Sequence, residues 1–254
     1  MMPGNAISFQ LWSALDAADS LREQLQTLKS LGYTDVQPYH DQYDDPRGMK
    51  ALLDEIGLTA RTGHFNMDMV VHQFDRVVDA AGVLGMGLVV APYIAPEARP
   101  ATVDGWKALG ALLQGCAELY AEAGLAFAWH NHEFEFFPLP DGSFPIEHLL
   151  GERLLWEIDV AWVARAGVDP LPWIRRYAGR IPAVHVKDMA PPGEKLDEDG
   201  WADVGTGVLD WQTFWPATVA AGSRLMIAEH DKPSDYRRFA TNSIIAMRKL
   251  AAST

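Results

Sequence analysis

The stretch LAFAWHNH (residues 125–132) shows the pattern from which the fold and the site are predicted. Its first five residues are apolar, as in a short buried strand, whereas its last three are polar. Two histidines at the end of a buried strand lose hydration, so a metal ion or a polar substrate must compensate them. The pattern recurs three times later in the chain. These runs are residues 154–159 with Asp159, 181–188 with His185, and 224–231 with Glu229. We therefore expect neighbouring strands that bring these side chains together.

Strand-like runs alternate with helical runs along the whole chain. The strand-like runs are residues 6–12, 33–39, 58–65, 88–93, 125–132, 154–160, 181–187 and 225–230. The helical runs are residues 19–31, 46–56, 68–84, 102–123, 146–150, 170–178, 211–221 and 234–251. Such alternation predicts right-handed crossovers and a parallel sheet. Eight units over 254 residues predict a single α/β domain, residues 1–254, folded as a (β/α)8 TIM barrel, with an open sheet of six or seven strands as the alternative.

The composition indicates a globular protein with a sizeable core, because 48% of the residues are hydrophobic and 22% are charged. The net charge is −13 and no basic stripe is present, which argues against a nucleic-acid partner. No segment approaches the roughly 18 apolar residues of a membrane span, so we expect a cytoplasmic protein with no membrane partner. The single cysteine, Cys116, cannot form an internal disulfide.

In a TIM barrel, catalytic groups lie at the C-terminal ends of the strands. Polar residues occupy these ends here: His64, His130, His132, Asp159, His185, Lys187 and Glu229. Alternate residues of a strand face the same way, so His130 and His132 should share a face, as should His185 and Lys187. Carboxylates with histidine suit Mn²⁺, Mg²⁺, Co²⁺ or Zn²⁺. Glu157 is expected to support neighbouring side chains.

Residues 189–207 form the longest irregular stretch and are rich in Pro, Gly and Asp. Loops of this length in compact domains are usually functional, so we expect an active-site lid. The Gly205-Thr206-Gly207 segment within it could cradle a phosphate. An ordinary tight turn is the favoured interpretation, because no Gly-Lys-Ser helix start follows.

Five motifs carry a resemblance to a known family. They are HNHEFEF (130–136), EIDVAW (157–162), GRIPAVHVKDM (179–189), VGTGVLDW (204–211) and AEHD (228–231). Together they resemble the sugar phosphate isomerase/epimerase family, the xylose isomerase-like TIM barrels. The match is close in the C-terminal half, whereas the N-terminal half matches mainly in pattern, through QLWS (10–13) and GHF (63–65).

The resemblance implies one divalent metal, Mn, Co, Mg or Zn, held by a Glu, Asp, His and Glu set. Asp159, His185 and Glu229 match the last three ligands. Many members have a glutamate where this chain has His130, and members with an HNH motif have one slightly later, which is Glu135 here. Glu135 is therefore expected as the first ligand, with His130 as the alternative.

The resemblance also implies a reaction on a small carbohydrate. The expected activity is a sugar isomerase or epimerase that removes a proton next to a carbonyl through an enediolate. Glu135 and Glu229 are expected as base and acid, His132 as a further proton carrier and Lys187 as an oxyanion contact. The substrate-binding residues expected around them are Trp12, His64, His130, Trp162 and Trp201. Family members often form homo-oligomers, which is expected here by resemblance.

Three other functions compete with this prediction. A metal-dependent lyase or dehydratase of a keto-inositol or a 3-keto-glycoside would use the same site and is the runner-up. An apurinic endonuclease of the same superfamily needs more histidines, including one where this chain has Trp162, and the acidic chain disfavours DNA. A sugar-binding protein without catalysis would be expected to lack the metal ligands.

Overall fold

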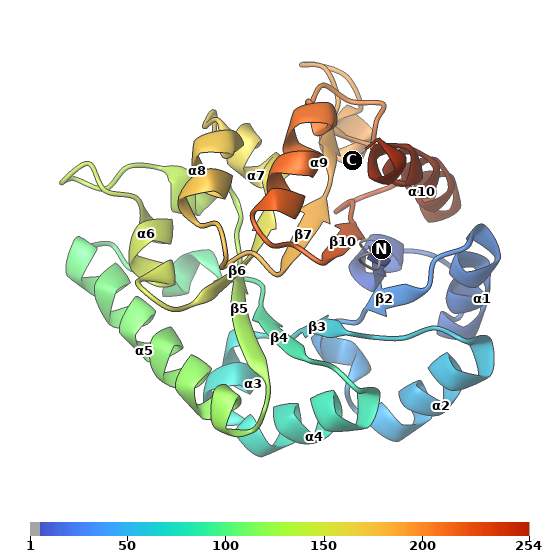
Figure 1. Ribbon diagram of the computed structural model, residues 1–254, viewed down its shortest axis with the longest axis horizontal. Coiled ribbons are helices and arrows are strands. Elements are labelled where there is room, and N and C mark those ends of the chain that lie inside the picture. Colours follow the sequence, from blue (N-terminus) through green and yellow to red (C-terminus); the bar gives the residue numbers. More distant parts are fainter. Residues whose placement is uncertain (1–5, 254) are drawn as a thin grey trace.

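The computed structural model describes residues 6–253 and forms a TIM barrel, which confirms the predicted fold class. The strands lie at the centre of the ring of helices in Figure 1. The barrel strands are β1 (Ala6–Gln10), β2 (Asp35–Gln37), β3 (Thr62–His64), β4 (Leu88–Ala91), β5 (Ala126–His130), β6 (Leu155–Asp159), β7 (Ala183–Val186) and β10 (Leu225–Ala228).

The helices surround these strands. They are α1 (Leu21–Leu31), α2 (Pro46–Ile56), α3 (Met67–His72), α4 (Phe74–Leu84), α5 (Val103–Glu122), α6 (Pro145–Leu150), α7 (Val160–Arg165), α8 (Pro170–Arg176), α9 (Trp211–Ala220) and α10 (Tyr236–Ala252). Short 3-10 turns follow several strands: η1 (Leu11–Ala14), η2 (His40–Gln42), η3 (Pro96–Ala98), η4 (Glu133–Phe136) and η5 (Leu196–Glu198).

The sheet is parallel in the order β2-β1-β10-β7-β6-β5-β4-β3. The two ends of this order meet through the bridge between Asp35 and Thr59. Backbone hydrogen bonds reinforce the seam, because Val36 N–H donates to Thr59 and His64 N–H donates to Pro38, both at 2.9 Å. The barrel is thus nearly closed and exposes no long sheet edge.

The inward-facing residues of the strands form two layers inside the barrel, an apolar layer and, towards the C-terminal ends of the strands, a polar layer. The apolar layer is a separate cluster: Leu88, Val90, Ala128, Ala183, Leu225 and Ile227. The next inward positions of β5, β6 and β7, two residues further on, are His130, Glu157 and His185. Outward residues such as Phe127, Trp156 and Met226 pack under the helices. The hydrophobic pattern therefore fixes which residues reach the C-terminal mouth.

The structure differs from the predicted elements in three places. The expected helix 68–84 is two helices, α3 and α4, because Gln73 between them leaves helical geometry at φ −124°. Helix α7 was not predicted, and Asp159 caps it by accepting the N–H of Trp162. The lid contains a short antiparallel pair, β8 (Asp188–Met189) and β9 (Trp201–Ala202), where an irregular loop was expected.

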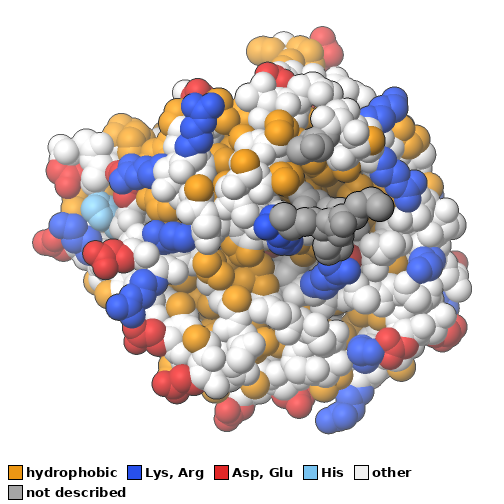
Figure 2. All heavy atoms as spheres, viewed as in Figure 1, with side chains coloured by type: hydrophobic (Ala, Val, Ile, Leu, Met, Phe, Trp, Pro, Cys, Tyr) orange, Lys and Arg blue, Asp and Glu red, His pale blue; other side chains and the backbone are white. Residues whose placement is uncertain are grey.

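The surface in Figure 2 carries Lys and Arg as well as Asp and Glu around its rim, with hydrophobic side chains between them. The charges of both signs are interspersed there rather than gathered in a basic stripe. Among the described residues, no helix has both the length and the apolar character needed to cross a bilayer.

Candidate metal centre and active site

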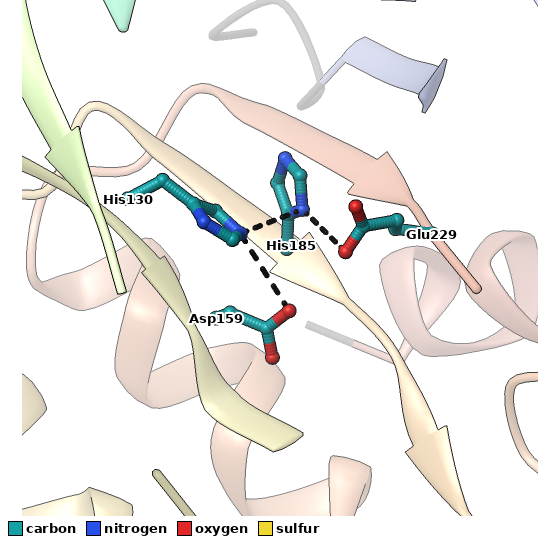
Figure 3. Close-up of side chains that lie close together, drawn as sticks. All are labelled: His130, Asp159, His185 and Glu229. Atoms are coloured by element: carbon teal, nitrogen blue, oxygen red, sulfur yellow. Dashed lines mark hydrogen bonds and ion pairs between the residues drawn. The ribbon is translucent and has the colours of Figure 1, made fainter. Parts of the chain in front are cut away.

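Four side chains from four neighbouring strands converge at the C-terminal mouth of the barrel: His130, Asp159, His185 and Glu229. Figure 3 shows them pointing toward one another from β5, β6, β7 and the end of β10. One donor atom of each lies within 4.8 Å of the others. His185 is central, because its Nδ1 lies 2.9 Å from Glu229 Oε2 and 3.1 Å from His130 Nε2. Three of these four residues are the predicted Asp159, His185 and Glu229.

Asp159 is held so that one of its oxygens faces this group. Its Oδ1 accepts the N–H of Trp162 at 2.9 Å. Asn131 ties the strand ends together, because its Oδ1 accepts the N–H of Asp159 and its Nδ2 donates to the carbonyl of the same residue. The other oxygen, Oδ2, is buried, accepts no hydrogen bond, and lies 3.2 Å from Lys187 Nζ and 3.7 Å from His130 Nε2.

A network of neutral amides and one carboxylate lies beneath His185. Its Nε2 lies 3.0 Å from Glu157 Oε1 and 2.8 Å from Gln37 Oε1. Both oxygens can only accept, so Nε2 carries a hydrogen. Glu157 also accepts from Gln37 Nε2 at 2.7 Å and from His64 Nε2 at 2.6 Å, and Gln10 Nε2 lies 3.2 Å from His64 Nδ1. Although burial opposes its charged form, His185 and His64 hold the pKa of Glu157 well below its usual range.

Lys187 is the buried cation of the site. Its Nζ lies 3.2 Å from Asp159, 2.8 Å from Glu229 and 2.7 Å from Asp231. Burial favours its neutral form, but the three carboxylates raise the pKa of Lys187. Burial also raises the pKa of Asp231, to about 6, with Lys187 opposing that rise. A buried ammonium of this kind compensates carboxylates that would otherwise repel one another.

The donor set of the four converging residues fits a divalent metal. Two imidazole nitrogens and two carboxylates are ligands that Zn²⁺, Mn²⁺ and Co²⁺ accept. His64, Glu157 and His185 also lie close enough to hold a metal, but their facing atoms are already paired with one another.

Glu135, expected as the first ligand, is placed elsewhere. The η4 turn directs its buried carboxylate toward the backbone, where Oε2 accepts the N–H of His132 at 2.9 Å and Oε1 accepts Trp129 Nε1 at 3.0 Å. Burial raises the pKa of Glu135 to about 8 despite these donors. It belongs to neither of the two groups of residues that could hold a metal, and His130, the alternative ligand, stands in its place.

A cavity of about 620 Å³ is lined by two of the four residues, His130 and Glu229, whereas Asp159 and His185 do not line it. Five of the predicted site residues line it: Trp12, His64, His130, His132 and Glu229. Tyr39, His40, Tyr93, Leu196 and Asp231 also line it. Burial, together with the charges of His130 and Lys187, lowers the pKa of His132, so this ring is neutral at neutral pH.

Lys187, Trp162 and Trp201, also predicted for the site, are not among the residues that line this cavity. The two indole rings lie beside Lys187 instead, with Nζ 5.0 Å from the Trp162 ring and 4.7 Å from the Trp201 ring. Such contacts stabilise a buried cation. These three residues therefore form the wall behind the carboxylates rather than the surface of the cavity.

The predicted lid is fastened to α10. Glu198, 1% exposed, accepts hydrogen bonds from the backbone and hydroxyl of Ser234 and from Arg238 Nη2 at 2.8 Å. Leu196, two residues earlier, lines the cavity and is 76% exposed. The hydrogen bonds of Glu198, which we call the latch, thus hold the lid where the apolar side chain of Leu196 lines the cavity.

The sequence interpretation missed Gln10, Gln37 and Asp231 as functional positions. All three lie at or just beyond strand ends, the same signal that indicated the histidines. The glutamines carry no charge, so burial at a strand end does not distinguish them as it does a histidine or a carboxylate. Asp231 lies three residues beyond the end of β10, where strand alternation does not predict the direction of its side chain.

Comparison with known proteins gives one family and several similar structures. The model of the "Xylose isomerase-like TIM barrel" family matches residues 25–244. The rhizopine catabolism protein MocC of Rhizobium meliloti is 33% identical over 86 residues, which is 34% of this chain and only 26% of MocC.

The similar solved structures show the same fold at low identity. A sugar phosphate isomerase/epimerase from Parabacteroides distasonis superposes with a TM-score of 0.80 at 19% identity, covering 98% of this chain and 95% of that one. The IOLI protein, solved with a zinc atom, superposes with a TM-score of 0.77 at 12% identity, covering 98% of each chain. The family model spans most of the barrel, and the chain therefore belongs to the xylose isomerase-like TIM barrel family.

Proposed function

We propose that this chain is a divalent-metal-dependent isomerase or epimerase of a keto-sugar or a related polyol. One observation carries the proposal: two histidines and two carboxylates from four strands converge, and two of them, His130 and Glu229, line a cavity of about 620 Å³. We take His130, Asp159, His185 and Glu229 as the metal ligands. A divalent metal held there would polarise a substrate carbonyl and stabilise the negative charge that develops beside it.

The chain's own residues would move the proton. Glu229 lines the cavity and is the first candidate proton acceptor; Lys187 and His185, against the effect of burial, hold its pKa well below the usual range, so it is ionised. His132 lines the same cavity with an unpartnered Nδ1 and is a second candidate carrier. Glu135, which accepts the backbone N–H of His132, would hold that loop in place rather than touch substrate.

Binding would come from the aromatic wall and the polar floor. The ring of Trp12 packs edge-on against Tyr39 at 5.3 Å and both line the cavity. Flat aromatic faces suit the C–H faces of a sugar ring, and the carboxylates and imidazoles suit its hydroxyls. The latched lid with Leu196 would limit the access of water to the reacting carbon.

The test is hydrogen exchange at the carbon next to the carbonyl. Protein loaded with Mn²⁺, Co²⁺ or Zn²⁺ is incubated with a panel of keto-sugars in D₂O and followed by NMR. We expect deuterium uptake at that carbon, abolished in Glu229→Gln and retained in the exposed variant Glu118→Gln. An unsaturated ketone without an isomer or epimer would overturn the isomerase proposal and favour the lyase, which would use the same residues.

A further inference from the structure

A second cavity of about 510 Å³ adjoins the one over the candidate metal centre. The two share the lining residues Trp12, Leu15, Asp16, Asp231 and Lys232. Its other walls come from the segment after η1, the lid residue Asp197 and the segment leading into α10. Leu15, Asp16 and Lys232 are exposed, so the shared rim opens to solvent on the same side as the active site.

Two charged side chains on this rim have no ion-pair partner among the described residues: Asp16 and Lys232. Three of the other four carboxylates around the second cavity are engaged, and the fourth, Asp197, lies away from the shared rim. Asp19 accepts from Tyr236 and Arg237, and Asp231 accepts from Lys187. The rim therefore offers one uncommitted acceptor and one uncommitted donor beside the partly buried ring of Trp12. A carboxylate, an ammonium and an aromatic ring together suit a neutral group rich in hydroxyls.

A phosphate group fits these surroundings poorly. Asp16 and Asp231 lie on the shared rim, and Asp199 lines the first cavity, so a phosphate would meet several carboxylates. Of the two cations that line the second cavity, Arg237 is already paired with Asp19 and Lys232 is unpaired. The backbone N–H groups of the Gly205-Thr206-Gly207 turn are also not free to bind a phosphate. The N–H groups of Gly205 and Gly207 donate to Asp188 Oδ2 at 2.9 and 3.2 Å, as expected for an ordinary turn.

We infer that the second cavity is a subsite for an uncharged sugar-like substituent, so that the substrate is a keto-sugar glycoside with a second ring and no phosphate. This inference rests on the proposed function, because it assumes that the reacting ketone lies over the candidate metal centre. The reacting ring would occupy the first cavity, and its substituent would cross the rim at Trp12 and contact Asp16 and Lys232.

The experiment compares a ketose with the same ketose carrying a glucosyl group. The probes are fructose, fructose 6-phosphate, and the glucosyl-fructoses turanose, maltulose, leucrose and isomaltulose, which differ in the position of attachment. The metal-loaded protein is assayed for deuterium uptake next to the carbonyl, and binding of each probe is measured by calorimetry. At least one glucosyl-fructose should show a kcat/KM about tenfold or more above that of fructose, and fructose 6-phosphate should fall below fructose.

Two variants narrow the second cavity from opposite walls: Ala18→Trp and Asp197→Trp. Both residues are exposed and line only this cavity. Each variant should lower kcat/KM for the preferred glucosyl-fructose about tenfold and leave fructose unchanged. The exposed variant Ala121→Trp on α5 should change neither value, and melting temperatures identify any variant that fails to fold.

The outcomes separate the two proposals. If fructose or its phosphate matches every glucosyl-fructose, or if neither folded tryptophan variant discriminates, the subsite is overturned. If no probe exchanges deuterium, the proposed function fails, and the subsite is judged by calorimetry alone. Binding of a glucosyl-fructose that is weakened by Ala18→Trp would then support the subsite, and no binding of any probe would overturn it.

Discussion

The Nε2 atom of His185 lies 3.0 Å from a carboxylate oxygen of Glu157. Since that oxygen can only accept, the contact places a hydrogen on Nε2. The other ring nitrogen, Nδ1, faces Glu229 and His130. Glu229 Oε2 can also only accept, so in the metal-free protein Nδ1 carries a hydrogen as well, and a bound metal would take the place of that proton. Glu157 would then orient His185 as carboxylates commonly orient histidine ligands.

Replacing Glu157 with glutamine should weaken metal binding about 10- to 100-fold. Glutamine keeps one accepting oxygen, so its NH₂ group would face either the donors of His185 and His64 or the donor of Gln37, and the negative charge beside His185 would be lost. Calorimetric titration of the metal-free protein with Zn²⁺ or Mn²⁺ measures the change. The exposed Glu118→Gln serves as control, and an unchanged affinity in folded Glu157→Gln would show that this contact does not orient the ligand.

Two variants test whether His130 or Glu135 is the first metal ligand. His130→Gln should lower metal affinity at least about tenfold, since it removes an imidazole from the group. Glu135→Gln should retain the affinity, because the carboxylate of Glu135 is bonded to Trp129 and the backbone of His132. Metal titration measures the affinity of both variants. Unchanged affinity in His130→Gln together with reduced affinity in Glu135→Gln would show that Glu135 is the ligand.

Lys187→Met should destabilise the metal-free protein by about 3–5 kcal/mol, because three buried carboxylates lose their ammonium partner. Added metal should then raise the melting temperature more than in the wild type, since Asp159 and Glu229 are no longer paired with Lys187. Thermal unfolding with and without Zn²⁺ measures both effects, and Lys107→Met, at an exposed position, is the control. An equal metal-induced shift in wild type and Lys187→Met would contradict this account of Lys187.

The lid should detach in acid. Although burial opposes ionisation, hydrogen bonds from Ser234 and Arg238 lower the pKa of Glu198 from 4.5 to about 2. A depressed carboxylate pKa stabilises the folded state above the unfolded value, and this stabilisation is lost as the pH falls from about 4.5 through 2. Hydrogen exchange of residues 189–207 should accelerate over that range.

Two glutamine variants test at neutral pH whether the hydrogen bonds of Glu198 to Ser234 and Arg238 hold the lid in place. Glu198→Gln should accelerate exchange of the same segment at pH 7, whereas Glu194→Gln, which is exposed on the same lid, should not. Equal exchange in Glu198→Gln and the wild type would show that Glu198 does not fasten the lid.

The barrel and most of the candidate site could be predicted because both depend on periodicity. Alternation along β6 and β7 determines that Asp159 and His185 face inward at the strand ends, and parallel order makes them neighbours, paired in register. The position of Glu135 could not be obtained in this way. It lies beyond the end of β5, where a 3-10 turn rather than strand alternation sets its direction.

The remaining differences have similar physical causes. The β8–β9 pair has only two residues in each strand, too few for a periodic pattern to appear. The support network of Gln10 and Gln37 joins residues from separate strands through hydrogen bonds, so it is apparent only when the barrel closes. The latch of Glu198 onto Ser234 likewise depends on where the lid lies against α10.

Metal content is the most direct test of the central claim. The purified protein is loaded with an equimolar mixture of Mn²⁺, Co²⁺, Zn²⁺ and Mg²⁺, desalted and measured by plasma mass spectrometry beside Asp159→Ala/His185→Ala. The account predicts about one equivalent of divalent metal per wild-type chain and almost none in the folded double variant. Equal metal in both proteins, or none in the wild type after loading, would contradict a metal centre at His130, Asp159, His185 and Glu229.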